Sequence, residues 1–163
     1  MEKITKSKTD YLIIGNSAAG VSAAENIRKI DKTGGIEIFS SENFVNYSRP
    51  LITYYLSGKI GPDRICFKSE EFYTRNNIIL NLSTAVTEID TSRQEVTTDR
   101  GRKIGYGKLL IASGGKPVIP FISVTGRNNK AAGPGSEISR LEGLEGIFTL
   151  TNLADAVALR RYI

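Results

Sequence analysis

One segment near the amino end, DYLIIGNSAAG at residues 10–20, constrains the fold of this 163-residue chain more than any other. The apolar residues 11–14 predict a buried strand, and Gly15 and Gly20 bound a turn that leads into small residues with helical spacing. A strand, a glycine-rich turn and a helix in this order are typical of the phosphate end of a dinucleotide site. The segment therefore predicts an α/β domain with a nucleotide ligand at this turn.

The composition of the turn follows from what such a site requires. Gly15 permits a tight bend that a residue with a Cβ resists, and Gly20 lets the helix lie close to the strand. Ser17 occupies the position that is glycine in the usual G-x-G-x-x-G pattern, so the match is incomplete. The alternative is an ordinary tight turn between a strand and a helix. The candidate nucleotide-binding residues are Gly15, Asn16, Ser17, Ala18, Ala19 and Gly20.

A second predicted strand, at residues 36–39, returns the chain where a β-α-β unit requires it. Ser41 and Glu42 follow its end, about 20 residues beyond the last glycine, where a carboxylate commonly binds ribose hydroxyls. Glu42 is the main candidate and Ser41 a lesser one. No arginine follows Glu42 directly, which argues against recognition of a 2′-phosphate. The alternative for Glu42 is a solvated carboxylate in a loop.

Composition limits both the chemistry and the surroundings of the chain. The absence of histidine excludes Ser-His-Asp hydrolysis and zinc chemistry, and no metal site is expected. A single cysteine, Cys66, excludes an internal disulfide and is typical of a reducing cytosol. The start of the chain lacks an apolar secretory segment, and no stretch reaches the roughly 18 apolar residues of a membrane span. We therefore expect a cytoplasmic protein with no membrane partner.

The charge of the chain gives no reason to expect a nucleic-acid partner. The net charge of +5 is moderate, and most basic residues are scattered along the sequence. One basic cluster, Arg100, Arg102, Lys103 and Lys108, suits a solvated hairpin better than a nucleic-acid surface.

The rest of the pattern predicts an α/β fold with a doubly wound, mainly parallel sheet and a small antiparallel β-meander. Pro50 suits the first turn of a short helix, and Ser69 can cap the next one. Residues 122–146 are rich in glycine, serine and charge, and predict a long loop. Helices are predicted at 51–56, 70–76 and 151–162, the last capped by Thr151 or Asn152, and strands at 11–14, 36–39, 78–80, 85–90, 95–98, 103–106, 108–111 and 147–150.

Three segments together resemble the amino-terminal part of the pyridine nucleotide–disulfide oxidoreductase family, whose members are flavoproteins with two dinucleotide domains. They are IIGNSAAG at 13–20, NYSRPLITYYLSGK at 46–59 and KLLIASGGKPVIP at 108–120. The second is similar to the flavin-side loop and helix of NADH:rubredoxin reductases, assimilatory nitrite reductase flavoprotein domains and enzymes like apoptosis-inducing factor. The third is similar to the family's second FAD fingerprint. The order and separations of the segments also fit this family.

The resemblance implies FAD as the cofactor and gives roles to individual residues. The turn at 15–20 would hold the pyrophosphate of FAD, and Glu42 with Ser41 would hold the adenosine ribose. Arg49, followed by Pro50, would lie beside the pyrophosphate or the ribityl chain; the alternative is an ion pair at the start of a helix. The other residues implied near the cofactor are Val86, through its backbone at the adenine, and Ala112, Ser113 and Gly114.

Departures from the family's pattern limit the implied chemistry. Tyr54 stands where the family often has a lysine near the flavin, so this position brings no positive charge; the alternative is an aromatic residue of the core. Members that reduce disulfides have a cysteine near the flavin-side helix, but residues 43–56 contain none. Cys66 is interpreted as a packed, small apolar residue rather than a nucleophile. Electron transfer through a thiol is therefore not expected.

The implied function is electron transfer from NAD(P)H through FAD to a small redox protein or another acceptor, with no catalytic side chain assigned. The expected organisation is part of an FAD-binding domain at 1–120, a long loop at 121–146 and the start of an NAD-binding domain at 147–163. The rest of the NAD domain would belong to a longer reductase or to a second chain.

Two other functions are compatible with parts of this pattern. The main alternative is a non-catalytic nucleotide-binding or interaction fragment, or a subunit, derived from such an enzyme. A single-domain NAD-dependent dehydrogenase is disfavoured, because the chain has no histidine acid and Ala-Ser-Gly-Gly at 112–115 fits a flavoprotein better.

Overall fold

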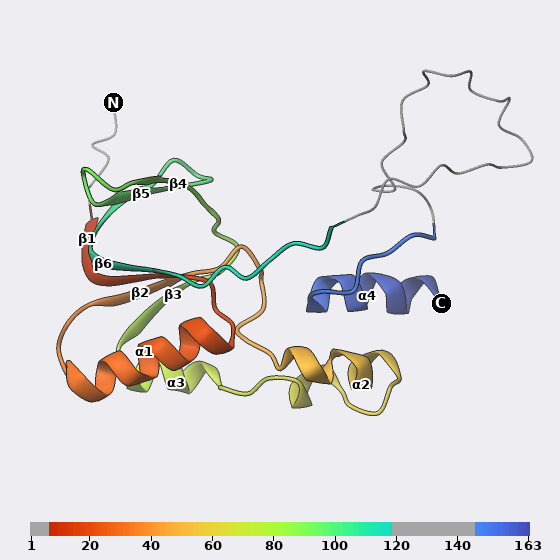
Figure 1. The fold of residues 1–163 in the computed structure, drawn as a ribbon. Helices are drawn as coiled ribbons and strands as arrows, with labels where there is room; N and C mark the ends of the chain where they lie inside the picture. Colours follow the sequence, from red (N-terminus) through yellow and green to blue (C-terminus); the bar gives the residue numbers. More distant parts are fainter. Residues whose placement is uncertain (1–6, 119–145) are drawn as a thin grey trace, which may run out of the picture. The chain divides into compact units, whose positions relative to one another are not determined.

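A computed structural model describes residues 7–118 and 146–163, and the chain divides into two compact units, Met1–Gly114 and Gly115–Ile163. The first unit holds one six-stranded sheet with the strand order β3-β2-β1-β6-β5-β4 (Figure 1). Its strands are β1 (Ser7–Ile14), β2 (Ile36–Phe39), β3 (Ile78–Asn81), β4 (Val86–Asp90), β5 (Glu95–Thr98) and β6 (Lys103–Ile111). Its helices are α1 (Ala18–Ile30), α2 (Ile52–Leu56), α3 (Glu70–Arg75) and the 3₁₀ turns η1 (Arg49–Leu51) and η2 (Pro62–Arg64).

The predicted mixed sheet is confirmed. Strands β3, β2, β1 and β6 are parallel, whereas β5 and β4 continue the sheet as an antiparallel meander. Ile14 at the end of β1 lies opposite Phe39 of β2 and Ile111 of β6. The carboxyl ends of three neighbouring strands therefore meet at one edge of the sheet, which is where open α/β sheets bind ligands.

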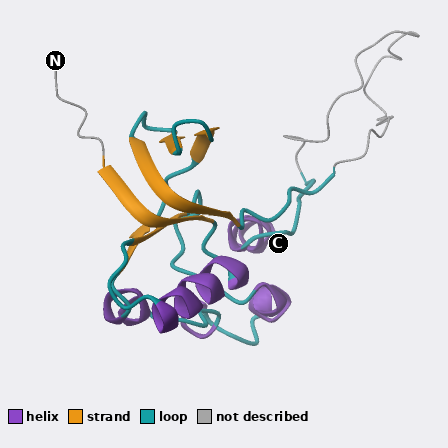
Figure 2. Cartoon of the chain, turned by 60° about the vertical axis from the view of Figure 1, so that its left-hand side comes forward, coloured by secondary structure: helices purple, strands orange, loops and turns teal. Residues whose placement is uncertain are grey.

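Alternate residues of β1 belong to two apolar cores. Ile13 packs on one face, in a cluster that includes Ala24 of α1 and Tyr73 of α3. Leu12 packs on the other face with Phe39 and with apolar residues of β5 and β6. Figure 1 shows α1 and α3 on one side of the parallel strands and β4 and β5 on the other, and the turned view in Figure 2 agrees. The middle of β1 and the whole of β2 are thus buried on both faces, which accounts for their nearly continuous apolar runs.

Strand β6 is longer than the sequence pattern predicts. The pattern gives separate strands at 103–106 and 108–111, but the structure has one strand through Gly107. A Cβ at Gly107 would lie 2.9 Å from the carbonyl oxygen of Asp10, so this glycine marks the close approach of β1 rather than a break. Strand β1 likewise begins four residues earlier than expected, because its polar start pairs with β6, with Ser7 opposite Ile104.

The helices of the first unit occur where the sequence predicts them, with differences at their ends. The helix expected at 51–56 begins as the 3₁₀ turn η1, with Pro50 in its first turn as predicted, and continues as α2. Ser69 is the N-cap residue of α3, as predicted, although its hydroxyl makes no capping bond. The backbone carbonyl of Ser69 instead accepts from the N–H of Phe72 at 3.0 Å, and two acidic residues occupy the first turn.

The second unit contains α4 (Leu153–Tyr162), and Asn152 is its cap. The Asn152 side chain accepts from the backbone N–H of Asp155 at 2.8 Å. Although burial opposes its charged form, bonds from Thr151 and Thr149 hold the pKa of Asp155 below its ordinary value. The strand predicted at 147–150 is wrong, because these residues pair with no strand in the part of the chain that the structure describes.

Two expectations concern residues outside the described ranges, in part or in full. The long loop predicted at 122–146 lies outside the described residues except for Gly146, and the domain boundaries at 120 and 146 stay predictions. No helix among residues 7–118 and 146–163 is both long and apolar enough to cross a membrane.

Candidate functional site

The glycines of the turn are fixed by contacts within the protein. Gly15 has φ of +114°, and a Cβ there would overlap the carbonyl oxygen of Ala112. A Cβ at Gly20 would overlap the carbonyl oxygen of Gly15 and would lie 3.2 Å from Cγ2 of Ile13. The turn therefore packs closely against both the end of β6 and the start of α1, as the sequence predicts for its two glycines.

Two of the predicted site segments, far apart in sequence, lie side by side. The N–H of Ala112 donates to the carbonyl of Ile14 at 2.7 Å, and the N–H of Gly15 donates to the carbonyl of Phe39 at 2.8 Å. The turn at 15–20 and the segment 112–114 are thus held together at the carboxyl edge of the sheet. Gly114 has φ of +73°, which would strain any residue with a Cβ, but a Cβ at this position would contact no other atom of the described residues.

A polar cluster joins this turn to the loop after β2. The Tyr47 hydroxyl donates to Glu42 Oε2 at 2.6 Å, and Arg49 Nη2 donates to Glu42 Oε1 at 3.1 Å. Arg49 Nε lies 3.4 Å from the Ser17 hydroxyl, and the guanidinium lies 5.4 Å from the centroid of the Tyr47 ring. Glu42 is thus a bonded carboxylate, not a merely solvated one, and Arg49 makes the ion pair that the alternative interpretation gave it.

The electrostatics at the turn favour an anion. Helix α1 is 13 residues long, its first turn contains no acidic residue, and the side chain of its N-cap Ser17 makes no capping bond. The helix dipole therefore presents partial positive charge at residues 18–20, and the guanidinium of Arg49 lies beside it, paired with Glu42. Asn16 Nδ2 is also a buried donor for which the described residues provide no partner.

The remaining predicted site residues occupy several places. Ser41 is exposed in the loop after β2, and Pro50 lies in η1. Val86 begins β4 beside that loop, because the N–H groups of Thr84 and Ser83 donate to the carbonyls of Ser40 and Glu42 at 2.8 and 3.1 Å. The structure thus brings the segment before Val86 next to the end of β2.

Tyr54 and Cys66 are both exposed. Tyr54 on α2 is 50% exposed, so the alternative of a core aromatic is wrong. The ammonium of Lys59 lies 5.5 Å from its ring centroid, so a cation does stand beside this position. Cys66 is exposed, and its interpretation as a packed residue is wrong, because its neighbour Ile65 takes the buried position instead.

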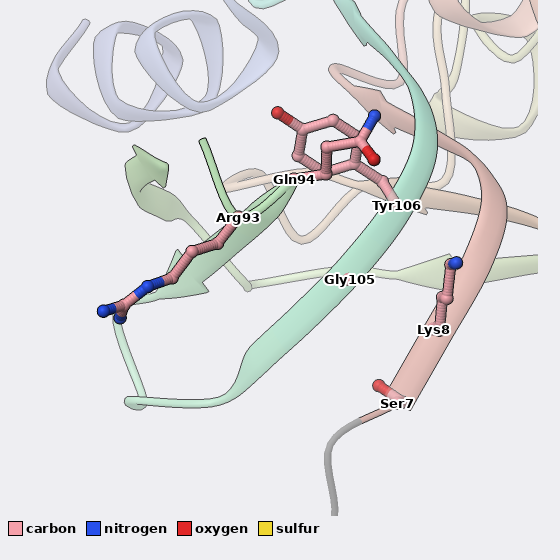
Figure 3. Close-up of a pocket in the computed structure, with 6 residues that line it drawn as sticks. All are labelled: Ser7, Lys8, Arg93, Gln94, Gly105 and Tyr106. Carbon is pink, nitrogen blue, oxygen red and sulfur yellow. The ribbon is translucent and has the colours of Figure 1, made fainter. Parts of the chain in front are cut away.

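A separate cavity lies at the opposite end of the sheet. It has a volume of about 320 Å³ and is lined by Ser7, Lys8, Arg93, Gln94, Gly105 and Tyr106 (Figure 3). Ser7 and Gly15 are separated by the whole of β1, eight residues or about 25 Å. None of the predicted site residues lines this cavity.

Sequence reasoning missed three side chains of the site region: Asn46, Tyr47 and Tyr73. Asn46 and Tyr47 belong to the quoted segment 46–59, but no pattern in the sequence indicated their contacts. Tyr73 donates to Asn16 across 57 residues, and one sequence carries no signal for such a pair.

Comparisons with known proteins agree with this geometry. Residues 9–161 match the family described as pyridine nucleotide-disulphide oxidoreductase. Rubredoxin-NAD(+) reductase of Pseudomonas putida is 33% identical over 92% of this chain and 35% of its own length. The assimilatory nitrate reductase electron transfer subunit of Bacillus subtilis is 36% identical over 69% of this chain and 15% of its own. The crystal structure of NADH:rubredoxin oxidoreductase from Clostridium acetobutylicum matches with a TM-score of 0.72 and 29% identity, over 95% of this chain and 35% of that one. The chain thus spans about a third or less of each of these proteins.

Proposed function

Because the chain belongs to the pyridine nucleotide-disulphide oxidoreductase family, we propose that it forms the FAD-binding part of an NAD(P)H-dependent flavoprotein oxidoreductase. One observation carries the proposal: the glycine-rich turn, the 112–114 segment and the Glu42–Arg49 pair lie together at the carboxyl edge of the sheet. This arrangement combines anion-binding backbone groups, a cation and a carboxylate, which are the groups that a dinucleotide's diphosphate and ribose require.

Each group has a part in holding FAD. Residues 15–20 and the start of α1 would receive the diphosphate, with Arg49 beside it through its contact with Ser17. Glu42, with Ser41, would accept bonds from the hydroxyls of the adenosine ribose. The residues proposed at other parts of the cofactor are Pro50 and Tyr54 on the flavin side, the backbone of Val86 at the adenine, and Ala112, Ser113 and Gly114 along its length.

The chemistry resides in the flavin, and the protein supplies binding and orientation. The chemistry that bound FAD would supply is electron transfer between NAD(P)H and an acceptor. Residues 43–56 hold no cysteine, so this chain's flavin-side loop provides no thiol for such a transfer.

The proposed partners are the NAD domain, from the rest of a longer reductase or from a second chain, and a small redox protein as acceptor. Strand β5 pairs with β6 only as far as Gly105, and Tyr106 N donates to Gln94 O beyond it. Past this point, at 107–111, one side of β6 has no strand beside it in the described residues, and Leu110 and Ile111 are exposed. An open edge of this kind accepts a further strand. A cytosolic location is part of the same proposal, supported by the lone cysteine.

Titration of the 163-residue chain with FAD and with riboflavin, followed by flavin fluorescence, tests the proposal. We expect FAD to bind and riboflavin to bind far more weakly, because the site's groups address the diphosphate and ribose that riboflavin lacks. Arg49→Gln should weaken FAD binding about tenfold, the effect of one charge-assisted contact. Arg75→Gln, which removes an arginine from an exposed ion pair on α3, is the matched control. Equal affinity for the two flavins, or no FAD binding, would overturn the proposal.

A further inference from the structure

A buried chain of three polar side chains joins the glycine-rich turn to the loop that carries Arg49. The Tyr73 hydroxyl donates to Asn16 Oδ1 at 2.7 Å and accepts from Asn46 Nδ2 at 2.9 Å. Asn16 lies in the turn, Tyr73 on α3, and Asn46 in the loop after β2. Only 8%, 4% and 2% of the surfaces of Asn16, Tyr73 and Asn46 are exposed.

Asn46 is the anchored end of this chain. Its Oδ1 accepts from the backbone N–H groups of Phe67 at 3.2 Å and Lys68 at 2.9 Å. Its Nδ2 donates to the carbonyl of Lys68 at 2.9 Å as well as to Tyr73. An amide that uses both atoms twice has one orientation, so Asn46 brings its N–H to the Tyr73 oxygen at a fixed place.

The Tyr73 hydroxyl must therefore direct its own proton elsewhere. Asn16 Oδ1 is the near acceptor at 2.7 Å, and the carbonyl of Val45 is a distant one at 3.4 Å. A tyrosine hydroxyl keeps its proton at neutral pH, and burial raises the pKa of Tyr73 further, to about 12. The direction of the bond, from Tyr73 to Asn16, is thus set by the N–H that Asn46 donates to the Tyr73 oxygen.

This bond fixes the Asn16 amide in a costly orientation. With Oδ1 turned to Tyr73, Nδ2 is buried and has no partner in the described part of the chain. A buried donor without a partner destabilises a fold, so the stability of the turn alone does not account for the arrangement.

We propose that Tyr73 is a positioning residue for the nucleotide. Through Asn16 it holds residues 15–20 in the conformation that receives the diphosphate before the ligand arrives, and through Asn46 it keeps this turn in register with the loop of Arg49. Tyr73 acts through Asn16. The inference rests on the proposed function, because the ligand that the turn receives is the diphosphate of FAD.

The test is Tyr73→Phe in the 163-residue chain, which removes only the hydroxyl. In this variant the turn should adopt its binding conformation for only part of the time. The association rate constant for FAD should therefore fall about tenfold, whereas the dissociation rate constant should stay unchanged. Stopped-flow flavin fluorescence measures both. Tyr106→Phe is the matched control, because Tyr106 is a buried tyrosine of the other core, and its FAD kinetics should stay unchanged.

A second measurement needs no ligand. Amide hydrogen exchange at residues 15–20 should rise several-fold in Tyr73→Phe, and exchange in β2 should not. Asn16→Ala breaks the same link from its other end. The two changes should therefore not add: the double variant should bind FAD with the same affinity as the single variant that binds it more weakly.

The outcomes separate the inference from the proposed function. If the unaltered chain binds FAD and Tyr73→Phe binds it with the same rates, the positioning role is wrong and the proposed function stands. Faster dissociation with unchanged association would also overturn it, because that signature belongs to a group that touches the ligand. Failure of the unaltered chain to bind FAD would overturn the proposed function, while the exchange measurement would still decide whether Tyr73 holds the turn.

Discussion

The residue whose environment is most restrictive is Gly15. Its φ of +114° strains any residue with a Cβ, and that Cβ would also overlap the Ala112 carbonyl. We expect Gly15→Val to abolish FAD binding while most secondary structure, followed by circular dichroism, remains. Gly101→Val is the control, because Gly101 also has positive φ, +74°, but open space around it. Unchanged FAD affinity in Gly15→Val would contradict the assignment of the turn.

Glu42 offers a test of the ribose side of the site. Glu42→Gln keeps the shape of the side chain but removes its charge, and we expect FAD affinity to fall about tenfold, near 1.4 kcal/mol. Glu25→Gln is the matched control, since Glu25 also forms a partly exposed ion pair, with Lys68. Calorimetric titration would measure both. Loss of a negative charge alone should favour the anionic FAD, so an equal loss of affinity in the two variants would contradict ribose recognition by Glu42.

Tyr73 should make stability depend on pH in the alkaline range. Burial raises its pKa in the folded chain from 10.0 to about 12, so the folded state binds this proton more tightly than the unfolded state does. The contribution is fully present below pH 10 and is lost as pH rises towards 12. The midpoint of urea unfolding should therefore fall more steeply between these pH values in the unaltered chain than in Tyr73→Phe. Parallel pH profiles would contradict this.

The site was predictable from the sequence only where its chemistry has a local pattern. Gly15 and Gly20 are spaced by the turn itself, and Glu42 follows a recognisable strand. Tyr73 was missed because its partners Asn16 and Asn46 are 57 and 27 residues away. Cys66 was wrongly predicted to be buried because its sequence neighbours are apolar. In a loop only some residues of such a run are buried, and here Ile65 is buried whereas Cys66 is exposed.

At the scale of elements, strands were predicted best where pattern and pairing agree. Strands β2 and β5 have the expected bounds, because turn signals stand on both sides of each. The bounds of β6 differ from the prediction, because Gly107 allows the backbone of Asp10 to approach closely, and Asp10 lies 97 residues away in the sequence. Residues 147–150 have strand-forming residues, but a strand exists only where a partner strand pairs with it.

The open side of β6 is the element that we expect to govern association. If another copy or chain pairs there, replacing the exposed Leu110 and Ile111 with lysine should reduce self-association of the chain, because charge at an edge opposes pairing. Sedimentation velocity over a range of concentrations would show it. Ile79→Lys is the control, on an exposed side chain of β3 at the other edge of the sheet. If Ile79→Lys has the same effect, the association is not specific to β6.

At the scale of the whole molecule, we expect the chain alone not to be a working reductase. Hydride transfer requires the nicotinamide in contact with the flavin, and the sequence contains one glycine-rich dinucleotide turn, at 15–20. FAD should bind weakly, and NADH oxidation with ferricyanide should stay well below about 1 s⁻¹. An intact reductase of the family in the same assay is the positive control. Turnover at or above that rate would reveal a nicotinamide site within these 163 residues.

The pairing of β1 with β6 has a consequence for the order in which the protein is built. Ser7 and Ile104 are partners, so the middle of the sheet closes a loop of nearly a hundred residues. Such long-range closure is slow relative to local structure, and on the ribosome it must wait until β6 has left the exit tunnel. A nascent chain that has emerged only as far as β5 already has its turn and α1, but not the backbone of Ala112 against which Gly15 rests. The nucleotide site is therefore among the last parts of the sheet to be completed. A ligand that reaches the chain during synthesis would encounter the turn at 15–20 without the segment 112–114.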